Sequence, residues 1–229
     1  ACHVVMTLVH VRAYARRRRP VRTPIPFASI PTATPPVPAG RVKPVVLTDP
    51  AIESLADEYA RSAGLAPPRR TINPKLDEER AKQIAAAYEA LPKRSDAAET
   101  IAAYTAFKRE VEAQYDFLKD FIMFTHTADD PYPDSAAMIR DVRAAQRLRV
   151  YKGGERHPFL GDVGPDGLSA NDKFRAIHDV FGHAMRGYQF GPQGEESAWR
   201  EHSKMFTPLA QRAMTTETRG QNSFFNFAP

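Results

Sequence analysis

Three of the seven histidines lie in one polar stretch of the chain, between Asn171 and Asn222. These histidines are His178, His183 and His202, and the same stretch holds four carboxylates of interest, Asp179, Glu196, Glu201 and Glu217. Imidazole and carboxylate groups are the ligands of catalytic zinc and of mononuclear non-haem iron. This stretch therefore predicts a metal site, and it is where we expect any chemistry to occur.

The spacing of His178 and His183 within HDVFGH constrains the helix that would carry them. In a regular α-helix, a residue at i+5 lies about 140° around the axis from residue i. Zinc proteases instead use an i, i+4 pair, which stacks both ligands on one face. For His178 and His183 to share one ion, the helix must be distorted or must end at Gly182, where glycine makes a distortion easier.

A third ligand must come from further along the chain. Glu217, which follows His183 by 34 residues, is the first choice, and Glu196 and Glu201 are the rivals. Two histidines and one carboxylate on one face of an octahedral ion leave positions open, which favours Fe(II) and oxygen chemistry. Zinc with an activated water is the main competitor. Packing and surface roles for the same histidines remain a plain alternative.

Other polar residues of the stretch receive supporting roles in this prediction. Asp179 would fix the tautomer of a liganding imidazole, or be a solvated charge. Arg219 would act beside Glu217, with Gln221 and Asn222 orienting an anionic or amide group of the substrate, or these residues would cap a helix. Trp199 and the phenylalanines of the C-terminal part would form the wall of a pocket or pack in the core: Phe206, Phe224, Phe225 and Phe227.

The C-terminal block resembles an uncharacterised protein family encoded by tailed phages and mobile elements. The residues that carry the resemblance are NDKFRAIHDVFGHA and GEESAWREHSKMFTPLAQRAMTTETRGQNS, within residues 170–227, together with AAYEALP at 86–92 and DPYP at 130–133. The resemblance implies no activity, but it makes a phage particle one expected location of the protein.

The same block is more remotely similar to the aromatic amino acid hydroxylases, which use a His-(Asp/Glu)-x-x-Gly-His helix followed by a glutamate. The matching positions are His178, Asp179, Gly182, His183 and Glu217, with Thr215 and Gly220 around the glutamate. The resemblance implies a mononuclear iron site that uses oxygen and a reduced pterin. No residue pattern for a pterin pocket accompanies it.

The charge of the chain is divided unequally along its length. Residues 1–48 contain eight basic residues and no acidic residue, which gives +8, whereas the remaining 181 residues carry 24 basic and 27 acidic residues, which gives −3. We expect an extended, Pro- and Arg-rich arm over residues 1–46 that contacts other protein subunits. Arg16, Arg17, Arg18 and Arg19 would allow non-specific contact with nucleic acid.

Composition limits the compartment only weakly. Cys2 is the single cysteine, so disulfides within the chain and cysteine-based metal sites are excluded. The arm resembles a mitochondrial transit peptide, while its charges follow rather than precede the apolar Val4–Val11, which argues against a secretory signal. An intracellular protein or a phage-particle protein fits best, and no apolar run is long enough to span a bilayer.

The remainder, residues 47–229, predicts a single, mainly α-helical domain with little strand, in which residues 170–227 form the metal-site-like block. Helices are expected over 49–64, 76–91, 95–121, 135–147, 171–186, 195–206 and 207–216, with a short strand over 148–151. Two functions follow. One is a metal-dependent enzyme, a hydroxylase-like Fe(II) oxygenase; the other is a structural or accessory subunit of a large assembly, such as a phage particle or an organellar complex, docked through the arm.

Overall fold

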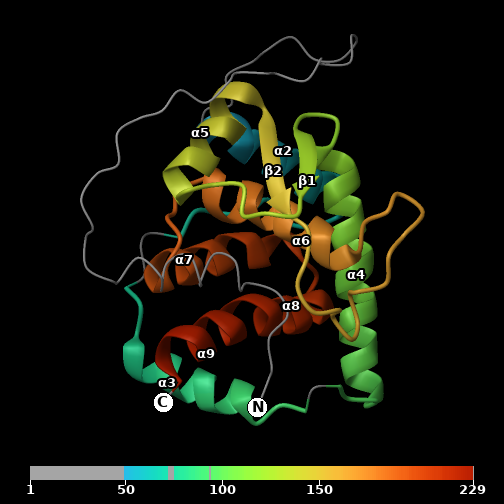
Figure 1. Cartoon of the computed structure of the whole chain (residues 1–229), viewed down its shortest axis with the longest axis vertical. Helices are drawn as coiled ribbons and strands as arrows, with labels where there is room; N and C mark the ends of the chain where they lie inside the picture. The colour runs from blue at the N-terminus through green and yellow to red at the C-terminus, as the bar shows by residue number, and fades with distance from the viewer. Residues whose placement is uncertain (1–48, 72–74, 93, 229) are drawn as a thin grey trace.

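The computed structural model describes residues 49–71, 75–92 and 94–228 as a mainly helical protein (Figure 1). Its α-helices and strands follow in the order α2 Asp49–Ser62, α3 Glu78–Glu89, α4 Ala98–Leu118, β1 Met123–Thr127, α5 Ser135–Ala145, β2 Arg147–Tyr151, α6 Ala170–His178, α7 Pro192–His202, α8 Pro208–Thr215 and α9 Gln221–Phe227. Two π-helical segments, η1 Asp179–Ala184 and η3 Thr216–Gly220, and a short 3₁₀ turn, η2 Ser203–Met205, continue these helices.

The long helix α4 is the central packing element. It lies against α6 and α8, while α3 runs beside α9 at the opposite end of the molecule from the strands (Figure 1). The apolar face of α4 carries Phe107 and Val111, which are fully buried. The Phe107 ring lies 4.8 Å from the Phe174 ring and 5.3 Å from the Phe206 ring. Burying side chains of this size stabilises the fold by about 1.5–3 kcal/mol each.

The two strands form a small parallel sheet. Met123 pairs with Arg147 and Thr127 with Tyr151, and α5 provides the connection between the strands. Parallel strands need such a crossover because the chain must return to the end of the sheet where the first strand began, which a tight turn cannot do. The sequence predicted β2, whereas it left residues 121–125 open between a helix end and a strand.

Side-chain caps explain where several helices begin. Asp77 accepts a hydrogen bond from the Arg80 amide, and Asp134 accepts one from Ala137. At α6, Ser169 and Asp172 form a reciprocal capping box. Each cap satisfies an amide that the helix itself leaves without a partner.

The mainly α-helical fold expected from the sequence is confirmed. One difference lies at the C-terminus, where the helix expected to end near residue 216 continues through η3 into α9. The arm over residues 1–46, with Arg16–Arg19 and Cys2, lies outside the described residues. Among the residues that are described, no helix combines the length and the apolar character needed to cross a membrane.

Candidate metal centre

The two histidines of HDVFGH are brought onto one face by a π-helical segment. His178 ends α6, and η1 begins at the next residue and contains His183. The amide of Met185 bonds to the carbonyl of Val180, an i→i+5 bond. This wider turn stacks residues five apart much as an α-helix stacks residues four apart. The distortion that the sequence required for a shared ion is therefore present in this form.

Gly182 leaves room for the His178 ring. A Cβ atom at this position would lie 3.0 Å from both Cε1 and Nδ1 of His178, and 3.2 Å from Cβ of Ala198. The ring of His178 thus packs directly over the glycine. The role of this glycine is steric, since its backbone does not take a left-handed conformation.

Glu195 is the carboxylate that joins the two histidines. It lies in the first turn of α7, where the helix dipole favours a negative charge. Its Oε2 is 3.5 Å from Nε2 of His183 and 3.7 Å from Nε2 of His178. The ligand atoms of all three residues lie within 4.8 Å of one another, and all three residues are buried.

Three atoms of this cluster that could bind a metal lack hydrogen-bond partners. Within the described part of the chain, His178 Nε2, His183 Nε2 and Glu195 Oε1 are buried without one. The two ion-pair distances are too long for hydrogen bonds. They are close to the roughly 3.0–3.5 Å that separates neighbouring ligands of one first-row metal ion. Buried polar atoms without partners are costly, and an ion bound between the three side chains would satisfy both imidazole nitrogens.

The charges of the cluster are shifted by burial and by each other. Burial lowers the pKa of His178 below its ordinary value. Burial would also lower the pKa of His183, but Glu195 and Asp179 outweigh it and raise that pKa. For Glu195, burial would raise the pKa, whereas the two imidazoles hold it well below its usual range. The carboxylate is therefore ionised at neutral pH, as a metal ligand must be.

Each histidine ring of the cluster is also contacted through its other nitrogen. Nδ1 of His183 lies 3.0 Å from the carbonyl oxygen of Tyr188. Nδ1 of His178 lies 3.1 Å from Nδ1 of His202, a fully buried ring whose pKa burial lowers far below its ordinary value. Contacts of this kind orient metal-binding imidazoles.

Asp179 lies beside this cluster. It is buried, and the loss of solvent raises its pKa to about 7, against the opposing effects of His183 and Arg175. Asp179 is therefore not the solvated charge that the sequence allowed as an alternative.

Glu217, the first choice for the third ligand, belongs to a different buried group. It accepts hydrogen bonds from the hydroxyl of Tyr104, from Nε2 of His157 at 3.0 Å and from the amide of Gln221 at 2.8 Å. Nδ1 of His157 accepts from two backbone amides, so its proton is on Nε2 and points at Glu217. The carboxylate has three donors and is satisfied within the protein.

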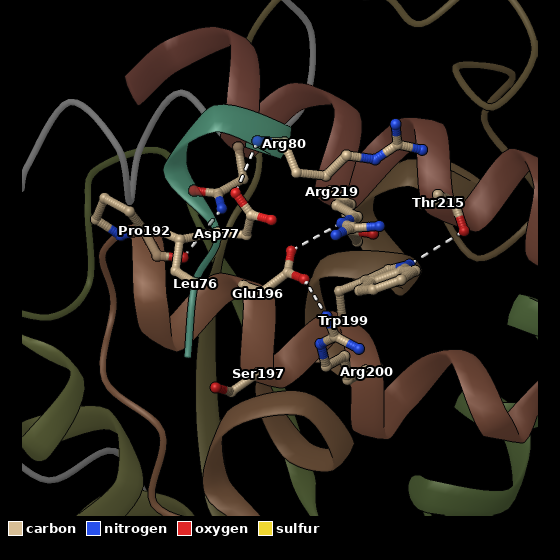
Figure 2. Close-up of polar contacts among 12 residues, drawn as sticks. Leu76, Asp77, Arg80, Pro192, Glu196, Ser197, Trp199, Arg200, Thr215 and Arg219 are labelled. Carbon is tan, nitrogen blue, oxygen red and sulfur yellow. Dashed lines mark hydrogen bonds and ion pairs between the residues drawn. The ribbon is translucent and has the colours of Figure 1, made fainter. Parts of the chain in front are cut away.

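Glu196, a rival ligand, is bound by two arginines (Figure 2). Nε of Arg219 and a terminal nitrogen of Arg200 each lie 2.9 Å from one of its oxygens. Both guanidinium groups also lie over the ring of Trp199, which donates to Thr215. The structure thus brings the predicted Trp199 and Arg219 together, but around Glu196 and not around the histidines.

The remaining candidates hold other segments in place. Glu201 accepts from the amide of Thr71 at 2.9 Å and pairs with Lys204 at 3.1 Å. Asn222 donates to the carbonyl of Pro192. Phe206 is buried in the core, whereas Phe224 packs at 5.6 Å against Tyr88 of α3, and Phe225 lies against Phe224.

Sequence reasoning missed Glu195, His202 as a partner of His178, and Gln114. Two signals pointed to Glu195. It is a carboxylate in the first helical turn after Gly191-Pro192, and it follows His183 by only 12 residues. Gln114 is a fully buried amide on the inward face of α4, a type of residue that needs a partner.

Comparison of the chain with protein-family models, with curated proteins and with solved structures gives no match.

Proposed function

We propose that this protein is a metal-dependent enzyme that holds one divalent ion through Nε2 of His178, Nε2 of His183 and the carboxylate of Glu195. The observation that carries the proposal is the convergence of three buried donor groups that lack hydrogen-bond partners. A carboxylate and two histidines are the donor set of mononuclear Fe(II) oxygenases, and we take Fe(II) as the resident ion. Zinc, which also binds His₂Glu, is the alternative.

The number of ligands supports a catalytic rather than a structural ion. Structural zinc sites are closed by four protein ligands, whereas catalytic sites keep a position open for water or substrate. Three residues form the cluster among those described. Bound Fe(II) would supply oxygen activation for hydroxylation, and the chain's own residues orient the ligands and exclude bulk water from them.

The test is metal content of the full chain, purified anaerobically with Fe(II) supplied and measured by mass spectrometry. We expect about one iron per chain, lost in Glu195→Gln. Glu196→Gln is the matched control, because Glu196 is the next residue on the same helix and is also buried. Iron lost equally from both variants, or kept in Glu195→Gln, would contradict the assignment. Zinc retained through the same three residues would redirect the proposal from oxygenation to hydrolysis.

A second candidate function is a subunit of a large assembly that docks through residues 1–46. The observation that favours it is the separation of charge, +8 in residues 1–48 against −3 in the remainder. Absence of metal from a folded full-length chain would favour this candidate. Co-sedimentation of the full chain with its assembly, lost on deletion of residues 1–46, would support it directly.

A further inference from the structure

A chain of hydrogen bonds links a backbone carbonyl to the ring of His178. It starts at the carbonyl oxygen of Met205, which lies 3.0 Å from Nε2 of Gln114. A carbonyl oxygen can only accept, so the NH₂ group of Gln114 must face it. The orientation of this buried amide is thereby fixed, and its oxygen faces the other way, towards His202.

The amide oxygen of Gln114 in turn fixes the proton of His202. It lies 2.8 Å from Nε2 of His202 and can only accept, so Nε2 carries a proton. The His202 ring has no exposed surface and is enclosed by aromatic rings, including Phe174, stacked at 5.9 Å, and Phe206 at 5.0 Å. Such an environment favours the neutral ring, which leaves Nδ1 of His202 with a lone pair.

This lone pair sets the tautomer of His178. The two Nδ1 atoms are 3.1 Å apart, and one of them must donate. Because Nδ1 of His202 has no proton, Nδ1 of His178 carries one and donates it. Nε2 of His178 is then unprotonated, and it is this atom that lies in the cluster with His183 and Glu195.

We infer that Gln114 and His202 are positioning residues that hold His178 in the tautomer able to bind a metal ion through Nε2. The inference rests on the proposed function for the ion itself, but the tautomers follow from the hydrogen bonds and from the complete burial of the His202 ring. Nδ1 of His183 likewise carries a proton, since it donates directly to the Tyr188 carbonyl. The relay also explains why helix α4 buries a glutamine completely.

Removing the amide oxygen of Gln114 would leave the proton on Nε2 of His202 without an acceptor. His202 could then move its proton to Nδ1 and donate to His178. In response, His178 would carry its proton on Nε2, the atom that the ion needs. Metal binding would then have to return both rings to their original tautomers. Changes to groups that orient metal ligands typically weaken metal binding about 10–100-fold.

The first test reads the tautomers in the unchanged full chain. Long-range ¹⁵N–¹H NMR of histidine-labelled protein, with metal removed by a chelator, should show Nδ1–H for His178 and Nε2–H for His202. His157 provides an internal reference of known hydrogen bonding, with its proton on Nε2. A proton on Nε2 of His178, or on Nδ1 of His202, would overturn the relay, and this readout needs no variant to fold.

The second test compares metal affinity in Gln114→Met and Gln211→Met, using Co(II) and competition with a chromophoric chelator. Gln211 is the control, because its side-chain amide also donates at 3.0 Å to a backbone carbonyl, that of Phe206, although Gln211 is only partly buried. We expect Gln114→Met to bind Co(II) about 10–100-fold more weakly than Gln211→Met, with the His178 proton moved to Nε2. Equal affinities would overturn the positioning role.

The two tests separate this inference from the proposed function. If the unchanged protein shows Nδ1–H on His178 but binds neither Fe(II), Zn(II) nor Co(II), the relay stands and the metal site falls. If it binds one ion per chain while His178 carries its proton on Nε2 in the metal-free state, the metal site stands and the relay falls.

Discussion

At the scale of single residues, Gly182 sets the position of a proposed ligand. Alanine there would bring a methyl group within 3.0 Å of the His178 ring and 3.2 Å of Ala198, so the ring must shift. We expect Gly182→Ala to weaken Co(II) binding by about tenfold or more, with a loss of about 1–3 kcal/mol in the free energy of unfolding. Chelator competition and urea unfolding measure the two effects.

Gly220→Ala is the control for this change. Its methyl group would lie 2.7 Å from Cδ2 of Tyr88, so it overpacks the second π-helical segment while leaving both histidines untouched. Gly220→Ala should therefore lose stability but keep its metal affinity. Equal weakening of Co(II) binding in the two variants would mean that a general loss of packing, and not displacement of His178, is responsible.

The buried carboxyl of Asp179 makes stability depend on pH. Its pKa is about 7 in the folded protein, against 3.8 for an ordinary aspartate. Between these values the unfolded chain releases a proton that the folded chain keeps, so the stabilising contribution of the carboxyl is full below pH 4 and is lost as the pH rises to about 7. Asp179→Asn cannot ionise and should escape this loss.

In metal-free protein, the free energy of unfolding of Asp179→Asn relative to the unchanged chain should therefore rise between pH 5 and pH 8. The expected rise is roughly 2–3 kcal/mol, because pH 5 lies about two units below the folded pKa and each unit corresponds to about 1.4 kcal/mol. Urea unfolding with a chelator present measures it. A constant difference between the two proteins across this range would show that Asp179 titrates near its ordinary value.

At the scale of elements, the capping box of α6 supports the helix that delivers His178. Ser169 accepts from the Asp172 amide at 3.2 Å, and its own amide donates to the Asp172 carboxylate at 2.9 Å. Ser169→Ala removes the hydroxyl and should lower the free energy of unfolding by about 1–2 kcal/mol in urea. Ser54→Ala, at an exposed hydroxyl that only donates to the Pro50 carbonyl, should stay within about 0.5 kcal/mol.

The elements also show what local sequence signals can predict. Caps and apolar periodicity located most of the helices, and the i, i+5 spacing of His178 and His183 required a distorted helix. The carboxylate that joins these two histidines comes from a separate helix, α7, so its identity depends on how α7 packs against η1. Glu195, Glu196 and Glu201 share α7, but only a three-dimensional arrangement decides which of them faces the histidines. Spacing along the chain does not contain that information.

At the scale of the whole molecule, Glu217 joins parts of the chain that are far apart in sequence. Two of its donors, Tyr104 of α4 and His157, are distant in sequence, and the third, Gln221, lies four residues further along in α9. Burial raises the pKa of Tyr104, and Glu217 raises it further, so the phenol keeps its proton and donates it. Such joints, like the parallel pairing of β1 with β2, are contacts between distant segments, which sequence periodicity does not reveal.

Glu217→Gln tests this structural role against the ligand role that the sequence predicted. The variant keeps the volume of the side chain but replaces one accepting carboxylate oxygen with an NH₂ group. That group is itself a donor and faces donors of the protein. A buried donor left without an acceptor costs about 1–3 kcal/mol, so the free energy of unfolding in urea should fall by that amount. Metal content should remain at about one ion per chain, because the donors of the cluster are His178, His183 and Glu195.

Glu195→Gln should show the reverse pattern, which makes the pair of variants decisive. Its carboxylate makes no hydrogen bond to the two histidines at 3.5 and 3.7 Å, so its loss should cost the metal-free protein less stability than Glu217→Gln does. It should nevertheless abolish stoichiometric metal binding. Metal lost from Glu217→Gln but kept in Glu195→Gln would place the ion at the carboxylate that the sequence first indicated, and would require the two helices to rearrange around it.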